Sequence, residues 1–335
     1  KRIFASVRWT EKPMESFEHI PRVEQPLGVR QPLFEHQLAS VYAMETIERM
    51  ERVSREPMYT IQSRVGINAN LAGYGKTLEM LGLISRDRMP WDMGTEHIHT
   101  YMANVHAGLM HMEKRVALPR TAASLVLVSS SLIAQWRLEL QKTTLTFKAV
   151  TSQRGIEDLV SSPLGGHPDV VLVVHTMFNR LCQRMTIAWK RFVFDEAGHS
   201  HIPGMESPTA GFHWLISATP SSIADRAAGR ISTSYQARLC YGRGRAGQLF
   251  LHRVAPYTVR NPESFVLRSY ALPPTEHVHH ACDSGGALKA LNGLVSSDVM
   301  HMLQAGDITG AANALGCASS TNIVELVKES KRAGI

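Results

Sequence analysis

The segment that most constrains this chain is Asn70–Thr77, which reads Asn-Leu-Ala-Gly-Tyr-Gly-Lys-Thr. A glycine-rich turn that ends in Gly-Lys-Thr and runs into an apolar helix lets backbone N–H groups converge on phosphate oxygens. Lys76 would reach the β- and γ-phosphates of a nucleotide, and the Thr77 hydroxyl would hold Mg²⁺. The full pattern has glycine at its first position, where this chain has Asn70. The octapeptide alone therefore leaves an ordinary turn before a helix as an alternative.

The composition is that of a folded protein with a mild preference for an anionic partner. Hydrophobic residues make up 44% of the 335 positions, and the net charge is +7. Such a charge favours a polyanion, although it is also common in proteins that bind no nucleic acid. The four widely spaced cysteines predict reduced thiols in an intracellular protein. No apolar run is long enough to span a bilayer and no signal-peptide pattern is present, so we expect a soluble protein.

Short, continuously apolar runs predict a mostly parallel sheet with helices on both faces. Runs of this kind are typical of central strands that are covered on each side. Helical patterns separate several of them, as at Leu132–Leu140, and another begins at Gln31, so the predicted fold class is α/β. The expected strands are Val65–Ile67, Ser124–Val128, Val170–Val174, Arg191–Phe194 and His213–Ile216, with a weaker one at Phe147–Val150.

Acidic and hydroxyl side chains follow two of these strands directly. Asp195 and Glu196 come after Arg191–Phe194, and Ser217-Ala218-Thr219-Pro220 comes after His213–Ile216. In a parallel sheet, ligands bind at the carboxyl ends of the strands. We expect Asp195 to hold Mg²⁺ through its water shell and Glu196 to orient and deprotonate an attacking water. An isolated Asp-Glu pair is only an acidic turn; its combination with the Gly-Lys-Thr loop is what points to nucleotide hydrolysis.

Residues 86–120 are less regular and contain four histidines. We interpret this stretch as a surface insertion with incidental histidines. A zinc site is the alternative, because imidazoles ligate zinc, but no cysteine joins them and the spacing matches no familiar finger. The four histidines are His97, His99, His106 and His111.

The order of these segments resembles the first RecA-like lobe of a superfamily-two helicase, of the SWI/SNF-like DNA translocase type. The phosphate loop of that group also lacks the first glycine. The segments "PLFEHQLASVYAM", "LVLVSSSLIAQWRLEL" and "VVLVVHTMF" are similar to three further motifs of the family, and Asp-Glu-Ala-Gly-His and Ser-Ala-Thr-Pro to two more. The resemblance covers about Leu33 to Pro220. It implies a RecA-like P-loop NTPase domain followed by a C-terminal helical extension.

The resemblance also implies roles for individual residues. Gln37 would contact adenine, and Asp195, Glu196 and Lys76 would form the catalytic group, with Thr77 and Asp195 as metal ligands. Ser217, Ala218 and Thr219 would couple the site to motion. Ser129, Ser130, His175 and Thr176 would lie along the nucleic-acid backbone. The remaining nucleotide-binding residues would be Gly73, Tyr74, Gly75 and Leu78; the family usually has Leu at position 74.

The expected organisation is an N-terminal arm at 1–30, a RecA-like lobe at 31–250 with its insertion at about 86–120, and a segment at 251–335 that leaves the lobe. Such motors hydrolyse ATP between two lobes, and the second lobe supplies arginine fingers. Tyr241–Gln248 looks superficially like a finger motif, but we interpret it as a basic glycine-rich loop. We expect the chain to stop inside an inter-lobe helical insertion, before a second lobe.

The expected function is that of an ATP- and Mg²⁺-binding motor lobe of a DNA-dependent translocase on double-stranded DNA, in the nucleus or another compartment that contains DNA. One alternative is a DEAH-like RNA helicase lobe, which Gln135-Trp136 and the Leu-Pro-Pro segment at 272–274 argue against. The other is a non-hydrolysing nucleotide- or DNA-binding assembly module.

Overall fold

The computed structural model describes residues 20–50, 53–56, 59–61, 63–105, 110–223, 254–270 and 295–315. The predicted glycine-rich loop at 241–248 and the Leu-Pro-Pro segment at 272–274 lie outside these residues, as do Cys240, Cys282 and Cys317. The chain divides into two compact units, Lys1–Leu272 and Pro273–Ile335. In the described parts of the chain, no helix is both long and apolar enough to cross a membrane.

The first unit is built on a seven-stranded, fully parallel sheet; the sequence predicted a mostly parallel sheet and did not predict the short edge strand β11. Its strand order is β11-β3-β10-β9-β6-β8-β7. Val-, Leu- and Phe-rich runs form the central strands because β-branched and aromatic side chains fit a pleated surface that is buried on both faces. The strands are β3 (Val65–Asn68), β6 (Ser124–Val128), β7 (Phe147–Val150), β8 (Val170–Val174), β9 (Ala188–Phe194), β10 (Thr209–Ile216) and β11 (Thr258–Val259).

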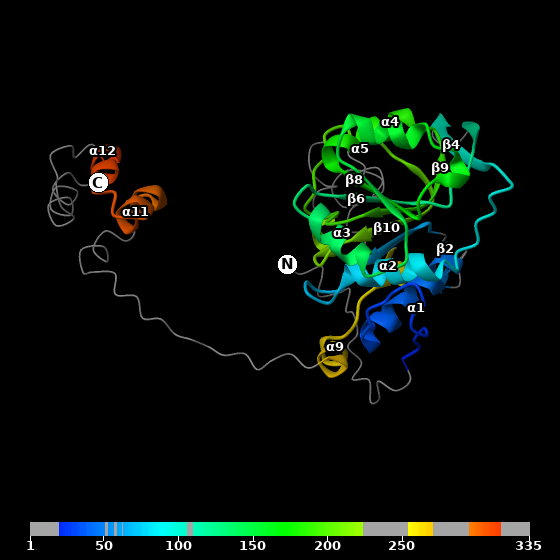
Figure 1. The fold of residues 1–335 in the computed structure, drawn as a ribbon, viewed down its shortest axis with the longest axis horizontal. Coiled ribbons are helices and arrows are strands. Elements are labelled where there is room, and N and C mark those ends of the chain that lie inside the picture. Colours follow the sequence, from blue (N-terminus) through cyan, green and yellow to red (C-terminus); the bar gives the residue numbers. More distant parts are fainter. Residues whose placement is uncertain are drawn as a thin grey trace. The chain divides into compact units, whose positions relative to one another are not determined.

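Helices cover both faces of this sheet, which makes the fold doubly wound. The chain moves outward from β3 through β6 to β7 and then returns through β8, β9 and β10. Right-handed crossovers in opposite directions place the connecting helices on opposite faces. Figure 1 shows α4 (Gln153–Val160) and α5 (His175–Arg184) on one side of the sheet, and α2 (Lys76–Arg86) and α3 (Ile133–Gln141) on the other.

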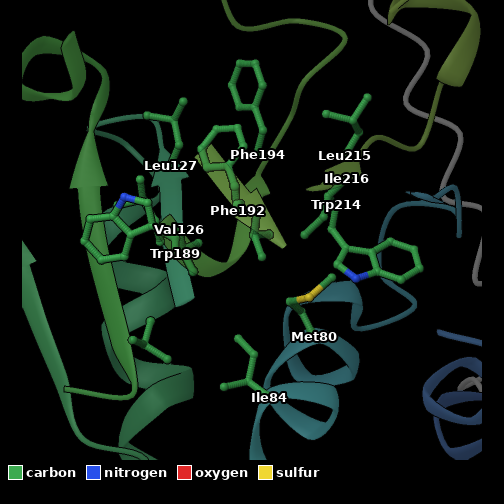
Figure 2. Close-up of a cluster of buried hydrophobic side chains, with 14 of the residues drawn as sticks. Met80, Ile84, Val126, Leu127, Trp189, Phe192, Phe194, Trp214, Leu215 and Ile216 are labelled. Atoms are coloured by element: carbon green, nitrogen blue, oxygen red, sulfur yellow. The ribbon is translucent and has the colours of Figure 1, made fainter. Parts of the chain in front are cut away.

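The core lies between these layers and consists of large apolar side chains. Figure 2 shows Met80 and Ile84 of α2 on the side of the sheet that carries Trp214. On the opposite side, Phe192 packs against Phe178 of α5, with ring centroids 5.6 Å apart. Burying one such side chain contributes about 1.5–3 kcal/mol. The apolar face of α2 thereby fixes the helix on the sheet, and with it the loop that precedes the helix.

Two further helices of the unit build on α2, the helix that follows the predicted phosphate loop at Asn70–Thr77. The predicted helix after Gln31 is α1 (Glu35–Arg49), which packs on α2, and α9 (Glu263–Ser269) packs on α1. Short 3₁₀ turns occur at Leu164–Gly166 and Ala255–Tyr257.

Residues 86–120 are more regular than the sequence analysis expected. They contain an antiparallel hairpin of β4 (His97–Val105) and β5 (Met110–Leu118). A second pair, β1 (Val53–Glu56) and β2 (Tyr59–Ile61), was also not predicted. In the second unit, the described residues form α11 (Ser297–Gln304) and α12 (Ile308–Ala314), which pack together through Val299, Leu303, Ala311 and Ala312.

Candidate nucleotide site

The phosphate loop lies between the end of β3 and the start of α2. Gly73 and Gly75 have φ values of 84° and 82°, in the left-handed region where a side chain is costly. Gly75 is the N-cap of α2 and supplies no side-chain cap, so the first N–H groups of the helix face the loop. Lys76 extends across the loop, and its ammonium donates to the Leu71 carbonyl at 3.1 Å. The glycine-rich turn leads directly into a helix, as the pattern predicted, and the roles of Lys76 and Thr77 towards a nucleotide stay predictions.

Asn70 explains why the loop has no glycine at its first position. Its side chain is fully buried, and its amide donates to the Glu79 carboxylate at 2.9 and 3.0 Å and to the Ser40 hydroxyl at 3.0 Å. Its amide oxygen accepts from the backbone N–H of Asn261 at 2.7 Å. Asn70 therefore joins the loop to α1, to α2 and to the segment that follows β11.

Glu79 is the buried carboxyl group at the centre of this network. Asn68 donates to it at 2.8 Å, in addition to Asn70. Burial raises the pKa of its carboxyl to about 7, while the bonds from Asn68, Asn70 and Ser40 and the charge of Lys76 act in the opposite direction. The amide donors thus stabilise a carboxylate that burial disfavours.

Gln37 and His36 connect α1 to the same loop. The Gln37 amide donates to the Tyr74 carbonyl at 3.2 Å, and its oxygen accepts from the Phe34 N–H at 2.9 Å. Nε2 of His36 is 3.1 Å from the Tyr74 carbonyl, and Nδ1 is 2.6 Å from the Ser269 hydroxyl. A carbonyl only accepts, so Nε2 carries the proton. The sequence analysis identified Gln37 but not His36 or Ser269.

The sheet register brings the acidic pair to the same edge as the phosphate loop. In β10, Ile216 pairs with Asn68 of β3, and Leu215 pairs with Phe194 of β9. The residues that follow these pairs lead into the phosphate loop, the Ser-Ala-Thr-Pro loop and Asp195-Glu196. Only β10 separates the phosphate-loop strand from the acidic strand.

Asp195 is buried and held by two donors. Its Oδ2 accepts from the Trp136 indole N–H at 2.7 Å, and its Oδ1 accepts from the Glu196 backbone N–H at 3.0 Å. Burial raises the pKa of the Asp195 carboxyl above its ordinary value, and the charge of Glu196 adds to this effect. The Trp136 bond and the Lys76 charge lower it.

Glu196 has an unusual backbone for a residue that is not glycine. Its φ is 50°, in the left-handed region. Such conformations concentrate at functional sites, where the surrounding structure maintains them. The turn is closed by the N–H groups of His199 and Ser200, both of which donate to the Glu196 carbonyl at 2.9 Å.

The Ser-Ala-Thr-Pro loop packs closely on the acidic turn. Ser217 is buried; its backbone N–H donates to the Asn68 carbonyl at 3.1 Å, and its hydroxyl accepts from the Thr219 N–H at 3.2 Å. A Cβ at Gly198 would overlap the Ser222 hydroxyl and lie 3.0 Å from the Ser217 hydroxyl. Glycine at 198 is therefore a requirement of close approach between the two loops.

The residues predicted to follow a nucleic-acid backbone lie at the ends of neighbouring strands. Ser129 and Ser130 follow β6, and His175 and Thr176 begin α5 directly after β8. Ser130 and Thr176 are exposed, and the Ser129 hydroxyl is 2.8 Å from that of Ser131. Burial lowers the pKa of the His175 imidazole, which favours its neutral form.

The histidines of the insertion do not form a metal centre in the part of the chain that the structure describes. His97 is buried, and its ring lies 5.6 Å from that of Trp91. Burial and the neighbouring charge of Arg64 lower its pKa to about 4. His97 is therefore a neutral packing residue rather than the surface group that the sequence analysis expected.

The glycine-rich loop before α2, the acidic pair after β9 and the parallel order of the sheet give this chain a RecA-like α/β fold. No protein-family model matches the chain. It is similar to a protein named "Putative helicase R592" from Acanthamoeba polyphaga mimivirus, at 19% identity over 400 aligned positions that take in 92% of this chain. The chain spans 45% of that relative's length.

Among solved structures, the chain is similar to "Sulfolobus solfataricus SWI2/SNF2 ATPase core in complex with dsDNA". The sequence identity is 14% and the TM-score is 0.48, with 93% of this chain and 66% of that chain covered. The name of the mimivirus relative is of the helicase type that the order of motifs suggested.

Proposed function

We propose that this chain is the ATP- and Mg²⁺-binding lobe of a DNA-dependent, helicase-type ATPase. The observation that carries the proposal is the sheet register: the loop that contains Lys76 and the acidic residue Asp195 both follow the carboxyl ends of parallel strands that only β10 separates. A phosphate-binding loop and an acidic pair in this relation are the two halves of a nucleotide-hydrolysing site. Neither half alone would distinguish hydrolysis from simple phosphate binding.

The residues of the loop are suited to a triphosphate. The Lys76 ammonium lies across the loop and donates to the Leu71 carbonyl. A bound phosphate would replace this carbonyl as the acceptor of the ammonium. The helix N-terminus adds N–H donors and positive potential. Gln37 is positioned beside Tyr74, where its amide would recognise the adenine edge.

Thr77 and Asp195 offer the hard oxygen donors that Mg²⁺ prefers. Asp195 fits this role because a carboxylate has about four acceptor positions, and two N–H donors leave capacity for a cation. When bound, Mg²⁺ would neutralise charge that develops on the phosphates. Glu196 would accept the proton of the attacking water, since its carboxylate is partly exposed beside the buried Asp195.

Duplex DNA is the proposed polymer partner. The net charge of +7, the exposed serines after β6 and the hydroxyl and imidazole groups at the start of α5 suit phosphate contacts. The DNA named for the Sulfolobus structure is the partner of that protein. For this chain, we propose that hydrolysis needs arginine fingers from a second RecA-like lobe, as the family resemblance implies.

The test is ATP hydrolysis by the chain with and without duplex DNA, with Glu196→Gln as the inactive control. We expect weak turnover by wild type that duplex DNA stimulates. Glu196→Gln should bind ATP but show no turnover. Stimulation by single-stranded RNA but not by duplex DNA would favour the RNA-helicase alternative. Binding of ATP that Lys76→Ala abolishes, without turnover by this chain alone, would fit a lobe whose hydrolysis needs a second lobe. No binding of ATP would overturn the proposal.

A further inference from the structure

Trp136 contacts the proposed metal-binding carboxylate through a bond that the motif pattern did not predict. Its indole N–H donates to Oδ2 of Asp195 at 2.7 Å, and both side chains are buried. The residues are 59 positions apart, so this contact between α3 and the end of β9 exists only in the folded chain. A short bond from a neutral donor to a buried carboxylate fixes the orientation of that carboxylate.

The same tryptophan is connected to the proposed nucleic-acid-facing loop. Its backbone N–H donates to the Leu132 carbonyl at 3.0 Å, and the Leu132 N–H donates to the Ser129 carbonyl at 3.1 Å. Ser129 and its exposed neighbours form the loop at the carboxyl end of β6. A displacement of this loop would therefore move the first turn of α3 and the indole with it.

We propose that Trp136 is a positioning residue that links contact of the 129–131 loop with nucleic acid to the orientation of the Asp195 carboxylate. This inference rests on the proposed function. Through this link, DNA at the loop would favour one orientation of Asp195, and Mg²⁺–nucleotide at Asp195 would favour one position of the loop. Such a coupling is reciprocal by thermodynamic necessity.

The chain contains a matched control for this proposal. Trp214 is also fully buried, and its indole N–H donates to a carboxylate, Glu48, at 3.0 Å. Glu48 also pairs with Arg191, in a contact that does not involve the phosphate loop or the acidic pair. Trp136→Phe and Trp214→Phe therefore remove the same chemical group from similarly buried rings, one at the proposed site and one outside it.

The experiment measures the Mg²⁺ concentration that half-saturates ATP binding, with and without duplex DNA, for wild type and both variants. We expect Trp136→Phe to raise this concentration about tenfold, because it loses a hydrogen bond to a charged group. DNA should lower the concentration for wild type and have little effect on Trp136→Phe. Trp214→Phe should behave as wild type in both respects, even if it unfolds at a lower temperature.

Replacement of Trp136 by benzothienylalanine, which keeps the ring volume but has no N–H, covers the case in which the phenylalanine variant does not fold. It should show the same loss. The inference is overturned if either Trp136 variant matches Trp214→Phe in its Mg²⁺ requirement and its response to DNA. A wild-type chain that binds no Mg²⁺–ATP overturns the proposed function as well, and a wild type that binds it without a specific Trp136 effect overturns only the inference.

Discussion

At the scale of single residues, Asn70 shows how a departure from a motif can be a structural requirement. Glycine would leave the phosphate loop without its links to Ser40, Glu79 and Asn261. The Glu79 carboxylate would then be buried with fewer donors, and a buried polar group that loses its partner is expensive. Asn70 thus lacks the backbone flexibility of glycine, but its side-chain hydrogen bonds hold the loop in one position.

Asn70→Gly restores the glycine that the full phosphate-loop pattern has at its first position, and we expect it to destabilise the chain. We expect the free energy of unfolding to fall by about 2–4 kcal/mol, because the buried carboxylate loses donors and glycine adds freedom to the unfolded chain. Denaturant unfolding monitored by circular dichroism measures this change. In Asn70→Gly/Glu79→Gln the buried charge is also removed, so the second substitution should cost less than it does in wild type. An Asn70→Gly variant as stable as wild type would contradict this account of the network.

At the scale of elements, Arg191 of β9 joins three parts of the unit. Its guanidinium donates to both oxygens of Glu48 on α1, at 2.7 and 2.9 Å, and to Asp87 at the end of α2, at 2.7 Å. Burial alone would raise the pKa of the Asp87 carboxyl, but Arg191 and Lys190 outweigh it and the pKa is lowered. The stability that Asp87 contributes is therefore present above the pKa of the unfolded carboxyl and is lost as the pH falls through the lower folded value.

Arg191→Met should cost about 3–5 kcal/mol of the free energy of unfolding, because it leaves Glu48 buried without its cation. The measurement is again equilibrium denaturation. Glu48→Gln/Arg191→Met is the control, since glutamine removes the charge and still accepts from Trp214. We expect the double variant to be more stable than Arg191→Met alone. Equal or lower stability of the double variant would show that the loss comes from packing rather than from the unpaired charge.

At the scale of the whole molecule, the sequence predicted the sheet well because its central strands are continuously apolar. Ser124–Val128, Phe147–Val150 and Val170–Val174 have the predicted bounds, and β9 and β10 only extend further towards their N-termini. The hairpin of β4 and β5 was missed because its histidines, methionines and small residues give no clear period of two. Continuous or alternating apolar residues reveal a strand, so a strand whose sequence has neither pattern is not recognised.

The site was predictable in its residue types and not in its connections. Gly-Lys-Thr and Asp-Glu are short patterns of residue types that suit phosphate and metal binding, so the sequence alone makes them visible as candidates. The bond from Trp136 to Asp195 and the bond from Asn261 to Asn70 join residues 59 and 191 positions apart. Contacts at such separations depend on the order of strands in the sheet, which no local pattern contains.

The proposed function requires that the Asn70–Thr77 loop binds a nucleoside triphosphate together with Mg²⁺. Titration calorimetry of the wild-type chain and Lys76→Ala with ATP, in Mg²⁺ and in a chelator, tests it directly. We expect wild type to bind ATP with Mg²⁺, and Lys76→Ala to bind about 10- to 100-fold more weakly because it loses a charge-assisted bond to phosphate. The chelator should also weaken binding to wild type. Equal affinities of wild type and Lys76→Ala, or no binding to wild type, would contradict the claim.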